Sequence, residues 1–208
     1  MVYLTLTLTL TLTLILTLTL TSVHFLRFND FFRGCEAMNT TADSGHILVD
    51  FSAISPSSEW SAVNDGVMGG ESRGGPAIVD GQLVFSGQIS LANNGGFSSV
   101  KSSGHQFDVS AFHSLRLRVK GDGRRYQLRL YTGARYGHSP IAYSAEFPTL
   151  AGEWTEPAIL ISQLSPRFRG RALSGPPLDV ERVEAIGLLL GDKRAGAFEL
   201  RVEWIRAE

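Results

Sequence analysis

The sequence predicts an all-β fold, an antiparallel β-sandwich or jelly roll, in a single domain over residues 38–208. Short apolar or alternating runs in this region are separated by clusters of glycine, asparagine, aspartate and proline, which is typical of strands and turns. No stretch sustains the 3.6-residue apolar period of a helix beyond a turn or two near 162–168. An open antiparallel sheet with this many strands tends to fold into two packed layers, because packing buries both apolar faces.

The first 37 residues differ from this region in composition. Residues 4–21 hold only leucine and threonine apart from Ile15, in strict alternation. A membrane helix needs about 20 mostly apolar residues, and the threonines dilute the hydrophobicity of this segment. We expect residues 1–37 to lie outside the fold, with Met38 as the true start of a cytoplasmic protein. The alternatives are a membrane-anchored or exported protein that uses residues 4–21, and a mitochondrial protein.

Nine runs are candidate strands. In the clearest of them Leu115, Leu117 and Val119 alternate with basic residues, so one face of the strand is apolar. The glycine-rich segment 121–124 that follows is expected to be a hairpin turn. Trp204 alternates with apolar neighbours, so we expect its ring in the core. The nine runs are 47–51, 77–85, 96–102, 114–121, 125–132, 141–147, 155–162, 183–192 and 198–205.

Charge and cysteine content exclude several classes of function. The chain of 208 residues carries 19 Lys and Arg against 20 Asp and Glu, a net charge of −1, so no global positive field favours nucleic acid as a partner. Membrane contact is expected only if residues 4–21 are a genuine membrane segment. The single cysteine, Cys35, precedes the predicted domain, which therefore has no disulfide, cysteine-ligated zinc or thiol nucleophile.

No catalytic constellation is evident, and we expect a protein that is not an enzyme and uses no cofactor. The five histidines form no H-E-x-x-H motif. Asp65, Asp122 and Asp192 each adjoin a glycine, and loops of this kind supply oxygen ligands to calcium. A single carboxylate per loop is also ordinary turn chemistry, so no metal is expected.

Three glycine-rich loops stand out: VNDGVMGGES at 63–72, NNGGF at 93–97 and GDGR at 121–124. Together with their flanks they resemble the complex I intermediate-associated protein family (NADH:ubiquinone oxidoreductase intermediate-associated protein 30). The resemblance spans about 47–205 and includes the segments LVFSGQISLANNGGFSSVKS, IAYSAEF, FRGR, PPLD and IGLLLGDKRAGAFELRVEWI. It implies a fold of the galactose-binding-domain type. It also implies a chaperone role, since eukaryotic members hold a membrane-arm intermediate of respiratory complex I in mitochondria.

The resemblance implies a non-enzymatic assembly factor or chaperone-like domain whose partner is a protein, such as a respiratory-complex assembly intermediate. Glycine and asparagine allow the loop backbones to approach a partner closely, and Met68 supplies an adaptable apolar contact. The expected binding residues are Asn64, Asp65, Gly66, Met68, Gly69, Gly70, Asn94, Gly95, Gly96, Asp122, Arg124 and Trp154.

Two further interpretations stay open. A carbohydrate- or small-ligand-binding module is the alternative function, with Trp60 and Trp154 stacking on sugar rings near one end of the sandwich. A cluster of arginines forms either a surface for phosphate or an acidic partner, or a solvated face that nearby acids neutralise. The cluster consists of Arg116, Arg118, Arg124, Arg125, Arg129 and Arg135.

Overall fold

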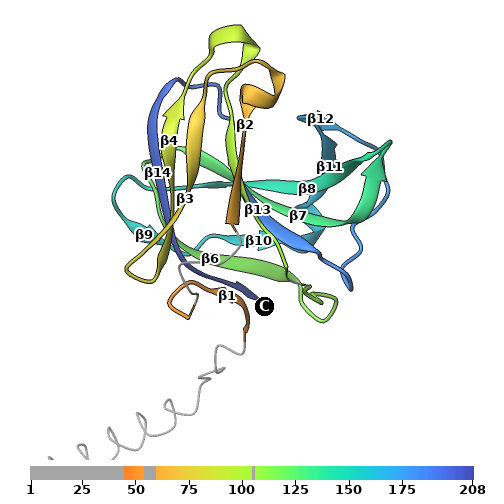
Figure 1. Ribbon diagram of the computed structural model, residues 1–208. Helices are drawn as coiled ribbons and strands as arrows, with labels where there is room; N and C mark the ends of the chain where they lie inside the picture. Colours follow the sequence, from red (N-terminus) through yellow and green to blue (C-terminus); the bar gives the residue numbers. More distant parts are fainter. Residues whose placement is uncertain (1–44, 54–59, 105) are drawn as a thin grey trace, which may run out of the picture. The chain divides into compact units, whose positions relative to one another are not determined.

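The computed structural model describes residues 45–53, 60–104 and 106–208, and this part of the chain forms a β-sandwich of two antiparallel sheets (Figure 1). The predicted fold class is confirmed. Within the described ranges no helix is long and apolar enough to cross a membrane. The expected leader, 1–37, and the expected domain start at Met38 lie outside the described residues.

The two sheets, called sheet A and sheet B, each contain seven of the described strands. Sheet A has the order β10 (Ala158–Leu160), β6 (Ser114–Lys120), β14 (Gly196–Ala207), β4 (Gln82–Ile89) and β3 (Arg73–Val79), with β1 (His46–Asp50) paired to β14 and β9 (Trp154–Thr155) paired to β6. Sheet B has the order β12 (Arg171–Ala172), β11 (Ser165–Phe168), β8 (Ser139–Pro148), β7 (Arg125–Tyr136), β13 (Ala185–Leu190), β5 (Ser98–Ser102) and β2 (Trp60–Asn64).

The core lies between the two sheets and follows the predicted alternation. On β6, Leu115, Leu117 and Val119 are fully buried, while the residues between them are partly exposed. On β7 the inward positions are Tyr126 and Leu128, which belong to the same apolar cluster. Burying a leucine side chain contributes about 1.5–3 kcal/mol, so rows of this kind hold the two layers together.

The run 77–85, expected as one strand, is a hairpin. Asp80 and Gly81 both have positive φ, 51° and 71°, and they connect β3 to β4. Aspartate followed by glycine is a preferred pair for a two-residue turn that matches the twist of its strands. The sequence also gave no indication of β2, β11 or β12. The helical turn expected near 162–168 is the short 3-10 helix η3 (Ile161–Gln163), and β11 follows it.

The segment 121–124, expected as a hairpin turn, instead carries the chain from one sheet to the other. Its preceding strand, β6, pairs with β14 in sheet A, whereas β7 pairs with β8 and β13 in sheet B. The prediction was wrong because a hairpin turn and a connection between two sheets can have the same short, glycine-rich sequence. Which sheet each strand joins depends on distant partners.

Trp204 does not lie in the core, contrary to the expectation. The pairing of β14 with β6 shifts register between Val202 and Trp204, which is the mark of a β-bulge. Both Glu203 and Trp204 are only partly buried, whereas Val202 and Ile205 are fully buried. The guanidinium of Arg206 lies 3.7 Å from the centre of the Trp204 ring. The extra residue therefore reverses the alternation that the sequence predicts.

Replacing Leu117 by alanine should reduce the free energy of unfolding by about 2–5 kcal/mol, because it leaves a cavity between the sheets. The side chain of Leu117 is fully buried, whereas that of Leu160 is 48% exposed. Leu160→Ala is therefore the matched control, with an expected change near ~0.5 kcal/mol. Urea denaturation of both variants checks this, and equal losses would contradict the assigned core.

Candidate functional site

Four connections that carry the chain between the sheets lie at the same end of the sandwich. They are 65–72 after β2, 90–97 after β4, 121–124 after β6 and 191–195 after β13. In sheet B, the end of β2, the start of β5, the end of β13 and the start of β7 lie in register. The start of β14 pairs with the end of β4 in sheet A. The three glycine-rich loops of the sequence are thus brought together, with a fourth.

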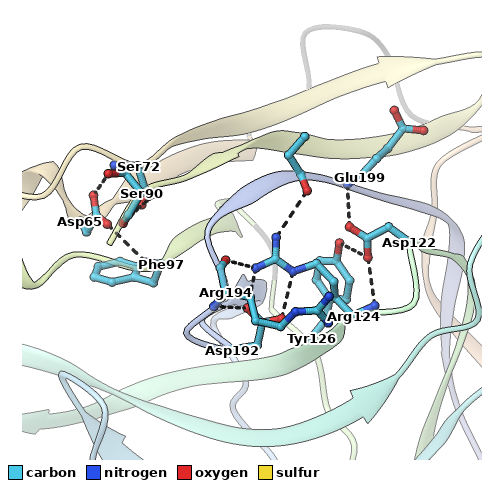
Figure 2. Close-up of polar contacts among 11 residues, drawn as sticks. Asp65, Ser72, Ser90, Phe97, Asp122, Arg124, Tyr126, Asp192, Arg194 and Glu199 are labelled. Carbon is cyan, nitrogen blue, oxygen red and sulfur yellow. Dashed lines mark hydrogen bonds and ion pairs between the residues drawn. The ribbon is translucent and has the colours of Figure 1, made fainter. Parts of the chain in front are cut away.

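The carboxylate of Asp65 ties two of these connections to each other. Its Oδ1 accepts a hydrogen bond from the backbone N–H of Ser72 at 2.9 Å, within its own connection. Its Oδ2 accepts from the N–H group of Gly96 at 2.6 Å. The same oxygen accepts from the N–H group of Phe97 at 3.3 Å (Figure 2). Asp65 is fully buried. Burial alone raises the pKa of Asp65, but the hydrogen bonds from Ser72, Gly96 and Phe97 outweigh it and leave that pKa below its ordinary value.

Two of the glycines are required by the Asp65 carboxylate. A Cβ atom at Gly70 would lie 2.4 Å from Cγ of Asp65, and one at Gly95 would lie 2.5 Å from its Oδ2. Gly66, in the same loop, has no atom within 4 Å of the place where its Cβ would be. Glycine at 70 and 95 therefore gives the backbone room to reach the carboxylate.

A buried ion pair ties the other two connections in the same way. Arg124, from the connection after β6, donates from Nε to Oδ2 of Asp192 at 2.9 Å and from Nη2 to Oδ1 at 2.5 Å. The two side chains are 6% and 12% exposed. Arg124 also donates to the carbonyl oxygens of Arg194 and Ala197 (Figure 2). Burial by itself raises the pKa of Asp192, but pairing with Arg124 holds that pKa below its ordinary range.

Asp122 completes this second network. Its Oδ1 accepts from the hydroxyl of Tyr126 at 3.0 Å, and its Oδ2 accepts from the N–H of Glu199 at 3.2 Å. Burial, with the charge of Asp122 beside it, raises the pKa of Tyr126 well above its ordinary value. The two networks adjoin, since a Cβ at Gly191 would lie 3.5 Å from the Cβ of Phe97. The described residues include no cluster of three or more His, Cys, Asp or Glu placed to hold a metal ion.

The predicted binding residues therefore divide into three groups by their exposure. Those that are buried, and shape the loops from inside, are Asp65, Gly95, Gly96 and Arg124. Those that are exposed and able to meet a partner are Gly66, Met68, Gly69 and Asn94, while Asn64, Gly70, Asp122 and Trp154 are partly buried.

Sequence reasoning missed two exposed apolar residues at this end. Val67 is 75% exposed and Leu91 is 45% exposed, beside Met68 at 52%. Val67 and Met68 belong to the 3-10 helix η1 (Asp65–Met68), and Leu91 precedes η2 (Ala92–Asn94). The Nδ2 group of Asn93 donates to the carbonyl of Gly69 at 3.1 Å and joins the two turns. The sequence feature that could have indicated this surface is Val67, an apolar residue next to Met68 in a glycine-rich loop.

The tryptophans considered for sugar stacking do not form one surface. Trp60 packs on Phe51 with ring centres 5.4 Å apart and contacts the core, at the far end of β2 from its loop. Trp154 is half-buried on β9 at the side of sheet A, where the guanidinium of Arg118 lies 5.4 Å from its ring centre.

A concavity on sheet B was not indicated by the sequence. It has a volume of about 280 Å³ and lies over the neighbouring strands β7, β8 and β11. Its lining is mostly polar: Gln127, Ser144, Ala145, Glu146, Gln163, Ser165 and Arg167.

The sequence model of the family described as Complex I intermediate-associated protein 30 (CIA30) matches residues 49–202. This range contains the networks of Asp65 and of Arg124. The chain belongs to this family. It is 31% identical over 128 residues to the mouse (Mus musculus) protein named Complex I intermediate-associated protein 30, mitochondrial. That match covers 60% of this chain and 38% of the mouse protein, so this CIA30 chain spans well under half of its relative.

Solved structures with a similar fold include the family 11 carbohydrate-binding module of a cellulosomal cellulase from Clostridium thermocellum. It is 16% identical, with a TM-score of 0.60, and the match covers 80% of this chain and 96% of the module. The same module in complex with a β-1,3-1,4-mixed-linked tetrasaccharide also gives a TM-score of 0.60 at 16% identity, over 78% and 95% of the two chains. At this identity the likeness establishes the sandwich fold of the CIA30 domain and nothing about its ligand.

Gly95→Ala should reduce the free energy of unfolding by about 1–3 kcal/mol, because the new methyl group meets the buried carboxylate of Asp65. Gly66→Ala is the matched control and should change it by less than ~0.5 kcal/mol. Urea denaturation of the two variants measures the difference. A Gly95→Ala protein as stable as Gly66→Ala would contradict the close approach.

Asp65→Asn should lower stability at pH 7 by about 1–3 kcal/mol, since an amide cannot serve the same three backbone donors. The folded pKa of Asp65 lies below 3.8, so the stability that its carboxylate supplies is complete above that pH and is lost as pH falls through the folded pKa. The gap between wild type and variant should therefore narrow in acid. Denaturation at pH 7 and pH 3 tests this, and a gap independent of pH would contradict it.

Proposed function

We propose that this CIA30 chain is a non-enzymatic, chaperone-like binding domain that holds a protein partner during the assembly of respiratory complex I. Membership of the family supports this role. The observation that carries it is the exposure of three apolar side chains, Val67, Met68 and Leu91, at the end of the sandwich where the four connections meet. The word mitochondrial in the mouse relative's name favours that compartment over the cytoplasmic one expected from a start at Met38.

The three side chains suit a protein partner because their support is rigid. The turns that carry them are joined by the Asn93 to Gly69 hydrogen bond, and the connection that carries Leu91 is fixed to Asp65. A pre-ordered loop loses little conformational entropy on binding, which leaves more of the apolar contact energy for affinity. The flexible thioether of Met68 adapts to partners of different shape.

The polar groups beside these turns support a non-catalytic role. Asp65 serves backbone donors, while Arg124 and Asp192 are paired with each other in a buried position. A general acid, base or nucleophile has to reach its substrate, and these groups are committed inside the protein. The same contacts suit a scaffold that keeps its loops in one conformation.

A carbohydrate- or small-ligand-binding module is the second candidate, favoured by the polar concavity of sheet B. Hydroxyl and amide side chains such as Ser165, Gln127 and Gln163 match the hydroxyl groups of a sugar. The surroundings of Trp154 do not add to this, since Arg118 already lies against its ring. A glycan array probed with the full chain, with and without Gln163→Ala in the concavity, separates the candidates: saturable binding lost in the variant would favour the sugar module.

Changing Val67, Met68 and Leu91 together to serine should abolish co-purification of respiratory complex I subunits with the tagged full chain. The apolar contact area is removed, while the buried frame is untouched. A control variant with serine at Ile47, Val79 and Leu160, which are 44%, 42% and 48% exposed, should retain the subunits. Quantitative mass spectrometry of the purified samples is the measurement.

Equal recovery of subunits with both variants would exclude these turns as the binding surface. Recovery of no complex I subunit with the wild-type chain would overturn the proposed function.

A further inference from the structure

The outer faces of the two sheets differ in how their arginines are neutralised. On sheet A, three arginines each have a glutamate partner within 2.8 Å: Arg116 with Glu208, Arg118 with Glu203 and Arg201 with Glu199. On sheet B, Arg129 and Arg167 form no ion pair with any of the described residues. Arg129 donates to Gln127 at 3.2 Å and Arg167 to the carbonyl of Gly170 at 3.4 Å, both uncharged acceptors. The glutamates of this face, Glu146 and Glu184, lie by Arg125 and Lys101. The charges of Arg129 and Arg167 are therefore left without an ion-pair partner among the described residues.

Two buried donors on the same face have no partner in the described structure. They are the Nε of Arg129 and the hydroxyl of Ser144. The two residues are in register on β7 and β8, and Ser144 is only 3% exposed. A buried polar group without a partner costs about 1–3 kcal/mol, so native proteins rarely retain one unless it serves a purpose.

These two unpartnered donors lie next to the concavity of sheet B. Ser144 lines it directly, and Arg129 is linked to it through Gln127. Arg167 lies on the neighbouring strand β11, in register with Ala142 of β8, and lines the same hollow. A group that enters this hollow meets Ser144 and Arg167, with Arg129 one hydrogen bond away through Gln127. The carboxylate of Glu146 also lines the hollow, and it already contacts Arg125 and Gln127.

Lys101 adds to the positive charge of this face. On β5 it pairs with Gly187 of β13, and Gly187 pairs on its other side with Arg129 of β7. Lys101 and Arg129 are therefore separated only by a glycine, which has no side chain. Its ammonium group is 4.3 Å from the centre of the Tyr131 ring. This cation–π contact holds the ammonium group over the ring, and the negative charge of Glu184 also lies near it.

We propose that this face of sheet B binds a carboxylate of an acidic segment of the protein partner, with Ser144 and Arg129 as its hydrogen-bond donors and Arg167 beside them. A carboxylate accepts hydrogen bonds only and has two oxygens, so one group satisfies both unpartnered donors and the charge. The choice of a polypeptide as the source of the carboxylate rests on the proposed function.

Fluorescence anisotropy of the full chain with a labelled hexaglutamate peptide tests the proposal. Saturable binding is expected, weakened about tenfold by Arg129→Gln and several-fold by Ser144→Ala. Arg201→Gln is the matched control, because it removes the same charge from sheet A, and it should change the dissociation constant less than ~twofold. A hexaglutamine peptide should not bind.

Ser144→Ala also separates a ligand-binding role from a structural one. Removing a buried hydroxyl that has no partner should leave the unfolding midpoint unchanged or raised, while affinity falls. A clear loss of stability would mean that the hydroxyl serves the fold, and would overturn its assigned role.

Three other results would overturn the proposal: no peptide binding, equal weakening by Arg129→Gln and Arg201→Gln, or binding of trigalacturonate in place of the peptide. The last result identifies a sugar acid as the carboxylate source. None of these results affects the outcome of the complex I co-purification experiment, because that experiment changes Val67, Met68 and Leu91 instead. Failure here with success there would leave the proposed function standing and remove only the acidic-segment site.

Discussion

Buried carboxylates at one end of the sandwich hold the two sheets in their relative arrangement. Each connection between the sheets has to leave a hydrogen-bonded strand and so exposes backbone groups that need new partners. Asp65 accepts hydrogen bonds from backbone N–H groups of two connections. Asp192 joins the other two connections through its ion pair with Arg124. The loops are therefore fixed in pairs, and every surface feature at this end depends on that fixation.

The sequence predicted what depends on local patterns and failed where distant partners decide. The alternation of Leu115 and Leu117 with basic residues was sufficient to predict strand β6 and which of its faces is buried. It failed at Trp204, because a bulge relative to β6 reverses the alternation, and nothing near Trp204 encodes the bulge. The glycine-rich segment 121–124 predicts a hairpin, because hairpin turns and crossovers between sheets use the same residues. The pairing of β6 with β14, about 80 positions away, settles the matter.

The candidate site was predicted in part, for a similar reason. The glycine-rich loops pointed to the end of the sandwich where the four connections meet. They could not show that Gly70 and Gly95 have to be glycine because the Asp65 carboxylate lies against them. The large apolar side chains exposed on these turns are Val67, Met68 and Leu91, of which only Met68 was expected. The hollow on sheet B escaped notice because Ser144 and Arg129 come together through strand pairing. In the sequence, Ser144 and Arg129 are polar residues of two separate strands, and nothing near either one indicates the other.

The position of β14 in sheet A has a consequence for the synthesis of the protein. This strand, which runs to Ala207, pairs with β1, β4 and β6, strands whose sequences are made much earlier. Until residues 196–207 leave the ribosome, those three strands lack the neighbour that joins them. Unpaired strand edges favour aggregation while they are exposed. The growing chain therefore exposes these strand edges until β14 emerges, a stage at which a chaperone would be useful to this domain itself.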